Sequence, residues 1–482
     1  MALFLGLDAG TQGAKALVYD AEAGRVVGRG ASAYGLLPAR EPGEAEQHPY
    51  TWVEGVEAAI AQALADPAVD ARAIRGLAVS GQQHGFVALD ERGEVLRPAK
   101  LWCDTSTAAE AAELSRTLGR PLPAGYTASK VLWLKRHEPE HFARLRTALL
   151  PHDYLNLHFT GTAVAEAGDA SGTGYFDPER REWDARAANA IDAGLLAMLP
   201  PLIGPDQPAG RIRPELAARL GLPEDLLVAP GSGDNMMSAL GAGAVADGVL
   251  VMSLGTSGTL FARSPRPVID PEGQIAPFCD ATGAWLPLLC TMNCTTVTEE
   301  VRAAFGLGLD ELTALAEAVP PGCDGLSFLP YLAGERSPDW PRASGVLHGL
   351  RAGGLRPGPL FRAAMEGASF ALLLGHERLR RFGVDAGELR VVGGASRNPL
   401  WRRILADAFQ LPLRFPAEPE SAALGAALQA AAVWSKRPVA AFVAAQGTPL
   451  LAETVSPRPD ARAAYQEALD RFHSLGRELF GG

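Results

Sequence analysis

The start of the chain places an apolar run, a short polar turn and a second apolar run one after another. The first run covers residues 3–7 and ends at Asp8, the turn contains Gly10 and Gly13, and the second run follows Lys15. Two apolar segments joined by a glycine-containing turn predict a β-hairpin. An ionised carboxylate at the end of a buried strand is costly unless it is paired or bound to a cation, so Asp8 is a candidate functional residue.

The turn of this hairpin carries groups that bind phosphorylated ligands. Gly10 and Gly13 permit positive φ angles and let backbone N–H groups come close to a ligand. Thr11 supplies a hydroxyl and Lys15 a positive charge. With the carboxylate of Asp8, these groups suit the phosphates of a magnesium-bound nucleotide. An ordinary glycine turn capped by the Asp side chain explains the same residues without a ligand.

The hairpin pattern returns about half the chain later. An apolar run at 249–254 leads into Gly255-Thr256-Ser257-Gly258, and another apolar run follows. This second turn repeats the Gly-Thr step of the first but has neither its Asp nor its Lys. Two such hairpins, one opening each half, predict two homologous α/β lobes that face each other across a nucleotide cleft. Small residues around 241–248 mark the boundary, so we expect lobes at 1–243 and 244–482.

Hydrophobic spacing predicts further elements between and after the hairpins. After Pro49, Trp52, Val56 and Ile60 recur at helical spacing and predict an amphipathic helix. The tail from Asp460 is predicted to be another amphipathic helix, which we expect to pack back on the first lobe. Apolar runs predict strands at 25–33, 74–80 and 285–289, and helical patterns predict helices at 295–305 and 361–382.

A polar loop follows the strand predicted at 74–80. Gln82, Gln83 and His84 lie between two glycines at the end of that strand. In α/β sheets, ligands bind at the carboxyl ends of strands, so these side chains are candidates for binding a small polar molecule. A single histidine in such a place is more often a structural hydrogen-bonding residue.

A second glycine-rich bend surrounds Asp234. An apolar run ends at Pro230, a Gly-Ser-Gly bend follows, and a helix is predicted from about Asn235, which places Asp234 at the helix N-cap. A plain N-cap aspartate would stabilise the helix by about 1 kcal/mol. The Gly-Ser-Gly bend and Gly241 indicate in addition a close approach of backbone or ligand. Asp234 is therefore the second candidate for chemistry.

A third bend lies in the second half. The apolar run at 389–392 ends in Gly393-Gly394, and Pro399, a residue type favoured at the first position of a helix, follows shortly after. Any tight strand-to-helix turn uses this pattern, so by itself it predicts a turn and no ligand.

Composition limits the class of protein. The 482 residues are 47% hydrophobic and 21% charged, as in a soluble globular protein with two large domains. The net charge of −11 and the lack of a basic run argue against nucleic-acid and anionic-membrane partners. Five cysteines without metal-binding spacing indicate free thiols in a reducing compartment. With no signal peptide and no apolar stretch long enough to span a membrane, we expect a cytoplasmic protein.

These motifs together resemble a known family. The doubled hairpin is similar to that of the actin, hexokinase and Hsp70 superfamily. The other motifs follow in order along the whole chain and resemble the FGGY family of carbohydrate kinases, in particular its members that phosphorylate D-xylulose. The segment Trp102-Cys103-Asp104 resembles the family's Trp-Asn-Asp segment, with Cys in place of Asn. Gly334–Pro338 resembles a family signature that we expect to join a loop to the core.

The resemblance implies an α/β fold of two ribonuclease H-like, actin-like lobes with a nucleotide cleft between them. It implies ATP-dependent phosphorylation of D-xylulose to D-xylulose 5-phosphate, with Asp234 accepting the proton of the hydroxyl and Asp8, also catalytic, binding Mg²⁺. A homodimer is expected by analogy with the family. The residues implied to bind the sugar are Gln83, His84, Trp102, Asp104 and Asn235, and those implied to bind ATP are Gly10, Thr11, Gln12, Lys15, Gly255, Thr256, Ser257, Gly394 and Asn398.

Three alternatives stay open. A kinase for another ketose or polyol, such as ribulose, glycerol or a tetritol, would share the scaffold, and the departure at Cys103 is the reason to keep it. A nucleotide-driven conformational protein of the actin or Hsp70 branches would have no polyol pocket for Gln82, Gln83 and His84 to line. A sugar-binding regulator on this fold is expected to need an added DNA-binding helical domain, and this chain starts at the hairpin.

Overall fold

The first predicted hairpin is present, and a mixed sheet is built around it. The computed structural model describes residues 2–481, in which β1 (Leu3–Ala9) pairs antiparallel with β2 (Gly13–Asp20) and Asp8 lies opposite Lys15. The strand order is β13-β14-β5-β1-β2-β3, with β15 also paired to β5. The other strands of this sheet are β3 (Arg25–Ala33), β5 (Ile74–Gly81), β13 (Gly210–Arg211), β14 (Leu227–Val228) and β15 (Ser232–Gly233).

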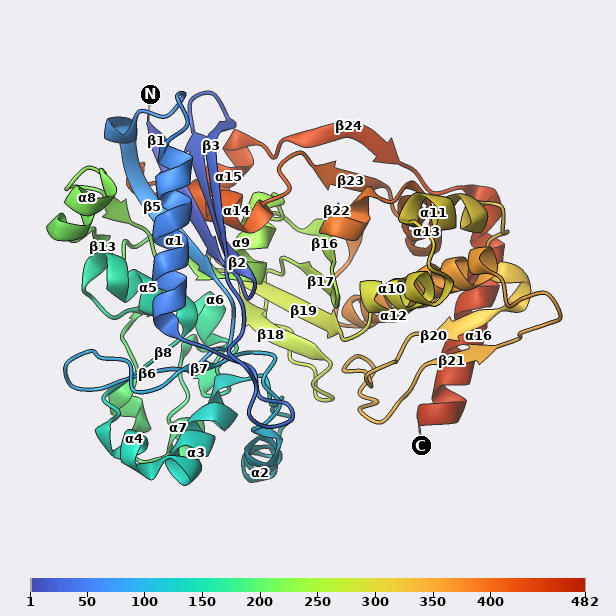
Figure 1. Cartoon of the computed structure of the whole chain (residues 1–482), viewed down its shortest axis with the longest axis horizontal. Helices are drawn as coiled ribbons and strands as arrows, with labels where there is room; N and C mark the ends of the chain where they lie inside the picture. The colour runs from blue at the N-terminus through green and yellow to red at the C-terminus, as the bar shows by residue number, and fades with distance from the viewer. Residues whose placement is uncertain (1, 482) are drawn as a thin grey trace.

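The second predicted hairpin builds a second sheet with the same arrangement. β16 (Gly248–Leu254) pairs antiparallel with β17 (Gly258–Ala262), as β1 does with β2. Each hairpin continues into an antiparallel strand on one side and into parallel strands on the other. The two hairpins therefore occupy equivalent places in two similar lobes (Figure 1). The other strands of this sheet are β18 (Ile275–Cys279), β19 (Trp285–Thr291), β22 (Ala386–Val392), β23 (Leu413–Pro416) and β24 (Leu450–Val455).

Two helices form a layer between the sheets. α9 (Asp234–Gly241) and α14 (Ser421–Trp434) pack on each other and share one apolar core with residues of both sheets (Figure 1). Their backbones cross where Gly241 meets Gly425, since a Cβ built on Gly425 would lie 1.9 Å from the carbonyl oxygen of Met237. No side chain fits at this crossing, so the two glycines hold α9 tightly against a helix from the second half of the sequence.

The predicted helices that cover the outer faces are also present. α1 (Pro49–Leu64) packs on β2 and β3 of the first sheet. On the outer side of the second sheet, α10 (Thr295–Phe305) has the predicted bounds, and α12 (Pro357–Arg381) packs against it. α12 begins four residues earlier than the helix predicted from Phe361, because Pro357 occupies its first turn, where proline is well tolerated.

The last helix lies elsewhere than predicted. α16 (Arg462–Phe480) packs on the second lobe, where Tyr465 and Phe472 contact the ring of Phe370 in α12. The prediction that this helix packs back on the first lobe was therefore wrong. The helix from the second half that packs on the first sheet is α14, which contacts β1, β2 and β5.

The remaining elements connect these layers. The other helices are α2 (Ala108–Leu118), α3 (Thr127–His137), α4 (Pro139–Arg144), α5 (Pro151–Thr160), α6 (Ala167–Ala170), α7 (Ala185–Ile191), α8 (Pro214–Leu220), α11 (Leu309–Glu317), α13 (Pro399–Phe409) and α15 (Val439–Gln446). The other strands are β4 (Glu46–Gln47), β6 (Val87–Leu89), β7 (Ala99–Lys100), β8 (Thr147–Leu149), β9 (Ala165–Glu166), β10 (Phe176–Asp177), β11 (Glu182–Trp183), β12 (Leu202–Ile203), β20 (Ser327–Leu329) and β21 (Val346–His348).

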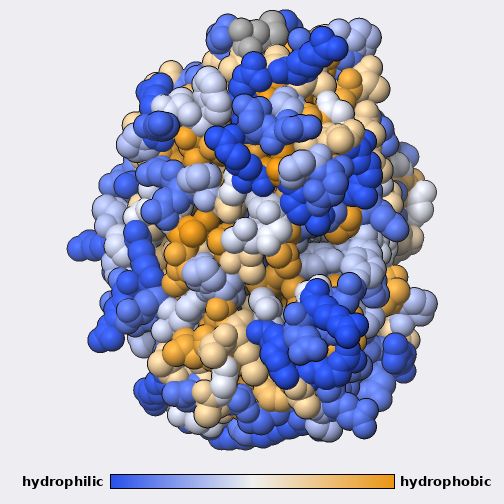
Figure 2. Space-filling view, turned by 90° about the vertical axis from the view of Figure 1, so that its left-hand side faces the viewer, coloured by the Kyte–Doolittle hydropathy of each residue, from blue (hydrophilic) through white to orange (hydrophobic). Residues whose placement is uncertain are grey.

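The side of the first lobe that faces away from the second is a mixed surface. Hydrophilic residues surround scattered groups of apolar ones there (Figure 2). Such a mixture is usual for protein surfaces, to which apolar atoms contribute a large share. Within residues 2–481, none of the helices combines the length and the apolar character that crossing a membrane requires.

Candidate active site

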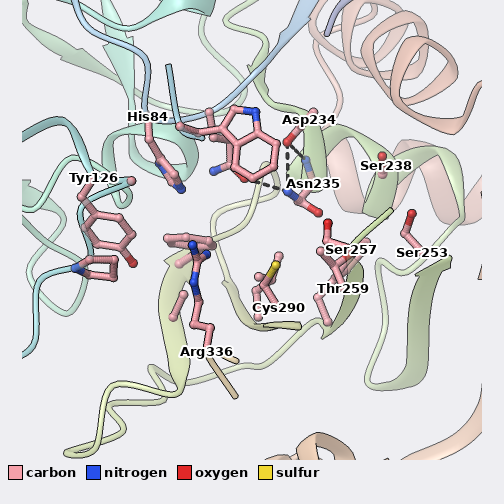
Figure 3. A pocket seen from close by; sticks show the side chains of 18 of the residues that line it. His84, Tyr126, Asp234, Asn235, Ser238, Ser253, Ser257, Thr259, Cys290 and Arg336 are labelled. Carbon is pink, nitrogen blue, oxygen red and sulfur yellow. Dashed lines mark hydrogen bonds between the residues drawn. The ribbon is translucent and has the colours of Figure 1, made fainter. Parts of the chain in front are cut away.

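A cavity of about 360 Å³ lies between the two lobes, and side chains from both lobes line it. The two predicted catalytic carboxylates, Asp8 and Asp234, open onto this same cavity. The labelled side chains of Figure 3 show how residues from distant parts of the chain converge on it. The first lobe contributes Asp8, Gln83, His84, Trp102, Tyr126, Asp234, Asn235 and Ser238, and the second Ser253, Gly255, Ser257, Thr259, Gln274, Phe278, Cys290 and Arg336.

Asp8 lies at the end of β1, beside the parallel strand β5. The hydroxyl of Ser80 in β5 donates a hydrogen bond of 2.7 Å to Asp8 Oδ1. Burial raises the pKa of Asp8, while the hydrogen bond from Ser80 and the charge of Lys15 act in the opposite direction. The carboxylate is therefore fixed in direction, yet a further positive charge in the cavity would stabilise its ionised form.

Asp234 is the first residue of α9, and Gly233 is the N-cap. The N-cap role predicted for Asp234 was thus wrong by one position. Asp234 Oδ1 accepts hydrogen bonds from the backbone N–H of Asn235 at 2.8 Å and from its Nδ2 at 2.9 Å. Burial raises the pKa of Asp234 to about 7, and the negative charges of Asp8 and Asp169 add to the effect.

The predicted sugar-binding side chains Gln83, His84 and Asn235 lie together. Asn235 Nδ2 donates to Gln83 Oε1 at 2.9 Å. His84 has φ of 64°, a left-handed conformation that is uncommon for a residue with a side chain and often found at ligand sites. Its ring centroid lies 5.0 Å from that of Tyr126 and 5.6 Å from that of Phe278.

His84 is held in its neutral form. Burial lowers the pKa of His84 well below its ordinary value, and the positive charges of Lys130 and Arg336 lower it further. Its Nδ1 is buried and has no hydrogen-bond partner within residues 2–481. A neutral imidazole can both donate and accept a hydrogen bond, which suits a sugar hydroxyl.

Trp102 joins the side of the cavity that Gln83 and His84 line to the turn between β1 and β2. Its Nε1 donates to Thr11 Oγ1 at 3.0 Å, and Thr11 Oγ1 in turn donates to Gln82 Oε1 at 3.1 Å. The hydroxyl of Thr11 is therefore engaged within the protein, and only the backbone of this residue is left for a phosphate.

Asp104, predicted to bind the sugar, does not line the cavity. Its side chain is fully buried, and its oxygens accept hydrogen bonds from the backbone N–H groups of Ala45 at 2.9 Å and Ser106 at 3.0 Å. It also forms a buried ion pair with Lys100. The carboxylate of Asp104 is thus occupied by partners within the fold, and the predicted contact with the sugar is not found in this structure.

Several residues predicted to bind ATP line neither this cavity nor a second cavity that lies beside it. Lys15 forms an ion pair with Glu420 at the start of α14, and Gln12 is exposed. The carbonyl oxygen of Thr256 accepts hydrogen bonds from the N–H of Cys294 at 3.0 Å and from the hydroxyl of Thr296 at 3.1 Å. The residues predicted for ATP that line neither cavity are Gly10, Thr11, Gln12, Lys15 and Thr256.

A second cavity of about 760 Å³ lies beside the first, and Gly255 lines both. The predicted nucleotide residues Gly394 and Asn398 line this second cavity. Asn398 caps α13, since its Oδ1 accepts from the N–H of Trp401 at 3.0 Å and its Nδ2 donates to Thr313 Oγ1 at 2.8 Å. The two cavities thus lie next to each other, the first lined by Gln83 and His84 and the second by the turn at Gly394.

Three glycines that were predicted to contact the nucleotide have free space beside them. Gly10, Gly255 and Gly394 have no positive φ, so the positive φ expected at Gly10 is not found. A Cβ would lie 3.7 Å from its nearest neighbour at Gly10 and 3.5 Å at Gly255, and would meet nothing within 4 Å at Gly394. The chain itself would therefore accept alanine at all three positions, and the open space in front of them suits a closely bound ligand.

Gly13, in contrast, is needed for packing. It also has no positive φ, but a Cβ there would lie 2.6 Å from the carbonyl oxygen of Ser32 in β3. The close approach of the two strands explains this glycine without a ligand.

Sequence reasoning missed several lining residues from the second lobe. The segment Gly334–Pro338 was predicted to join a loop to the core, and Glu335 does so by accepting hydrogen bonds from the N–H of Met292 at 2.7 Å and from Asn293 Nδ2 at 3.2 Å. The next side chain, Arg336, points into the cavity instead (Figure 3). The positive charge of Arg336 within the segment Gly334–Pro338 was the sequence signal that could have indicated this role.

Two similar lobes enclose a cavity that holds two carboxylates, and a second cavity lies beside it. This arrangement is typical of enzymes that transfer a phosphoryl group from a nucleotide to a small molecule. The model of the FGGY family of carbohydrate kinases, N-terminal domain, matches residues 3–241, and that of the C-terminal domain matches residues 250–434. The chain belongs to the FGGY family of carbohydrate kinases.

Individual relatives are similar over most of their length. The chain is 38% identical to the xylulose kinase of Haemophilus influenzae over 89% of this chain and 90% of that one. It is 40% identical to the xylulose kinase of Streptomyces coelicolor, over 91% and 89%. A solved structure described as a "xyloylose kinase" from Brucella ovis superposes with a TM-score of 0.92 at 34% identity and covers 99% of both chains.

Proposed function

We propose that this enzyme phosphorylates D-xylulose at its terminal hydroxyl, with ATP as the donor, to give D-xylulose 5-phosphate. The observation that carries the proposal is the shared cavity, in which Asp8 and Asp234 of the first lobe face Gly255 and Ser257 of the second. The similarity to xylulose kinases over about nine-tenths of the chain supports the choice of sugar.

Asp234 is proposed as the general base. It accepts the proton of the sugar hydroxyl while the oxygen bonds to the terminal phosphorus of ATP and the bond from that phosphorus to the bridging oxygen breaks, releasing ADP. With its pKa raised to about 7, Asp234 is partly ionised at neutral pH and holds a proton more strongly than an ordinary aspartate. The two hydrogen bonds from Asn235 hold the accepting carboxylate in place. Positioning of this kind matters most for phosphoryl transfer, because its transition state is loose.

Asp8 is proposed to hold Mg²⁺. Magnesium sites in phosphoryl-transfer enzymes use one or two carboxylates together with substrate phosphates and water. The cavity fits this pattern, because the carboxylates of Asp8 and Asp234 open onto it and leave space beside them for phosphates and water. When bound, the ion would neutralise charge on the phosphates.

The nucleotide is proposed to lie across the two cavities that share Gly255. Gly255 and Ser257 would contact the phosphates, together with the backbone at Gly10 and Thr11, while Gly394 and Asn398 would border the adenosine. Support comes from the three glycines that have room for a Cβ. The lobe boundary at 243–244, the homodimer and the cytoplasmic location remain predictions.

Product analysis tests the proposed reaction. The purified enzyme, incubated with D-xylulose, ATP and Mg²⁺, should form D-xylulose 5-phosphate and ADP in equal amounts, detected by ³¹P NMR. Panels of ribulose, glycerol and tetritols test the alternative of another sugar or polyol. Consumption of ATP that is independent of sugar would contradict the proposal.

The Asp234→Asn variant tests the base. It should lower kcat on the order of 1,000-fold, within the range that general-base catalysis contributes, while the affinity for ATP stays nearly unchanged. Asp385→Asn, which alters an exposed aspartate, is the matched control and should keep full activity. An active Asp234→Asn enzyme would remove Asp234 from the mechanism.

A further inference from the structure

Arg336 belongs to the second lobe but points into the sugar side of the cavity. In Figure 3 its side chain lies with His84 and Tyr126 of the first lobe, while Asp234 and Ser257 lie on the other side. Its charge acts on both of these neighbours, lowering the pKa of His84 and opposing the rise in that of Tyr126. Arg336 therefore faces the part of the cavity that is remote from the proposed base.

The guanidinium of Arg336 is unused in the fold. Among residues 2–481, neither a hydrogen bond nor an ion pair is formed by its side chain, although it is only partly exposed. The adjacent carboxylate of Glu335 is buried and bound to the backbone of Met292 and to Asn293. The N–H donors of Arg336 are therefore free to bind a ligand in the cavity.

The chemistry around Arg336 favours an oxygen that only accepts hydrogen bonds. A guanidinium has five N–H donors and no acceptor, whereas a sugar hydroxyl needs a partner for its own proton as well. No Asp or Glu lines this side of the cavity, and the unpartnered Nδ1 of His84 can accept the proton of only one neighbouring hydroxyl. A ketone oxygen fits such a donor-only group better than a hydroxyl does.

We infer that Arg336 binds the carbonyl oxygen of the open-chain ketose, at the end of the substrate remote from the hydroxyl that is phosphorylated. This inference rests on the proposed function, which places the reacting hydroxyl at Asp234. Arg336 then makes the enzyme select ketoses over polyols of the same length. Because His84 and Arg336 come from opposite lobes, the ketose also links the two lobes across the cleft.

The test compares D-xylulose with xylitol and D-arabinitol, the two pentitols that differ from it only by reduction of the carbonyl. In Arg336→Met, kcat/KM for D-xylulose should fall about 10- to 150-fold, the range expected for loss of a hydrogen bond to a charged group, mainly through a higher KM. With the pentitols, kcat/KM should stay within about threefold of the wild type, since no such bond is lost. Arg336→Lys keeps a charged donor and should retain part of the ketose preference.

A matched control is available in the same region. Arg342→Met alters an exposed arginine a few residues later and should leave the ketose preference unchanged. Retained pentitol turnover in Arg336→Met shows that this variant folds. If the wild type phosphorylates D-xylulose and Arg336→Met keeps the full ketose preference, or loses both substrate classes equally, the inference on Arg336 is wrong while the proposed function stands. If the wild type phosphorylates only pentitols, the proposed function itself fails.

Discussion

The turn between β1 and β2 and the turn between β16 and β17 share a Gly-Thr step but differ in length, since four residues separate the paired Ala9 and Ala14 and three separate the paired Leu254 and Gly258. In each, the first glycine donates its N–H back across the turn, from Gly10 to the carbonyl oxygen of Gly13 at 3.0 Å and from Gly255 to that of Ser257 at 3.1 Å. Each turn also joins an antiparallel hairpin whose first strand pairs with a parallel neighbour. A glycine turn of similar construction therefore occurs in both lobes, one residue longer in the first.

The side chains around the turns differ in charge. Two residues before the first glycine stands Asp8 in one turn and Ser253 in the other, and both line the cavity. Across the strand pair, Asp8 lies opposite Lys15 and Ser253 opposite Thr259. A carboxylate in both turns would surround a polyanionic nucleotide with negative charge. The backbone cradle can thus be duplicated, while the carboxylate is useful on one side only.

The two turns are also anchored to different parts of the site. Thr11 in the first turn is hydrogen-bonded to Gln82 and Trp102 on the sugar side. The carbonyl of Thr256 in the second turn accepts from Cys294 at the start of α10. The first turn is therefore hydrogen-bonded to the loop that carries Gln82, and the second to the start of α10, which borders the second cavity.

The largest expected difference between the turns is in kcat. Asp8→Asn removes the carboxylate and should lower kcat on the order of 100-fold, a size typical for loss of one group that stabilises charge at a reacting centre. Ser253→Ala removes only a neutral hydroxyl and should cost less than about tenfold. Steady-state rates over a range of Mg²⁺ concentrations measure both, and Asp8→Asn should need more Mg²⁺ for its half-maximal rate. Equal losses in the two variants would contradict the charge asymmetry.

The second expected effect is on the pH dependence of kcat/KM. It should follow residues of the first lobe, because the lining carboxylates, Asp8 and Asp234, both belong to that lobe. The pKa of Asp234, raised to about 7, means that its proton-accepting form is lost below that pH. We expect kcat/KM to fall about tenfold per pH unit below pH 7 and to level off above it. An initial-rate profile across neutral pH measures this, and a profile that stays flat well below pH 7 would argue against Asp234 as the base.

The same pKa predicts the reverse effect on stability. Because the pKa of Asp234 rises from 3.8 to about 7 on folding, its ionised form destabilises the fold above pH 7, and this cost disappears as the pH falls toward 4. At about 1.4 kcal/mol per pKa unit, Asp234→Asn should raise the free energy of unfolding by up to about 4 kcal/mol at mildly alkaline pH. Near pH 4 it should change little. Urea unfolding at both pH values, beside the Asp385→Asn control, tests this.

A smaller effect is expected from filling the open glycines. Gly10→Ala and Gly255→Ala should fold normally, because a Cβ has room at both positions, yet each methyl would intrude where a phosphate approaches. We expect the KM for ATP to rise about tenfold in Gly255→Ala, a cost of 1–2 kcal/mol for a tight steric contact, and less in Gly10→Ala, which does not line the cavities. Gly387→Ala, at an open glycine of β22 that lines neither cavity, is the control. An unchanged KM in Gly255→Ala would contradict a phosphate at that turn.

Local patterns predicted the elements and the residues whose roles depend on those elements. The hairpin at Asp8, the strand end at His84 and the bend before Asp234 are each defined by glycines and apolar runs within a few residues. Such signals are read directly from the sequence, and the structure brings these three residues to one cavity.

The features that local patterns did not predict involve partners that are distant along the chain. Lys15 has a suitable charge for a phosphate, but Glu420 from the second half pairs with it. Asp104 has a suitable carboxylate for a sugar, but Ala45 and Lys100 occupy it. Arg336 was assigned to the loop structure, although the loop needs only the glutamate before it. Hydrophobic periodicity does not indicate which distant residue pairs with a charged side chain. These partners are therefore identified only in the folded structure.

The smallest expected effect separates the two interpretations of Lys15. Its side chain is 45% exposed and that of Glu420 32% exposed, so their ion pair should contribute no more than about 1 kcal/mol to stability. If Lys15 only links the first hairpin to α14, Lys15→Met should change the KM for ATP by less than about threefold. The double variant with Glu420→Gln should then lose no more stability than either single change. A rise of tenfold or more in the KM for ATP in Lys15→Met alone, with Glu420→Gln unaffected, would instead return Lys15 to the phosphates. The charged chemistry of the first turn would then extend beyond Asp8, and the contrast between the two turns would be larger than the cavity alone indicates.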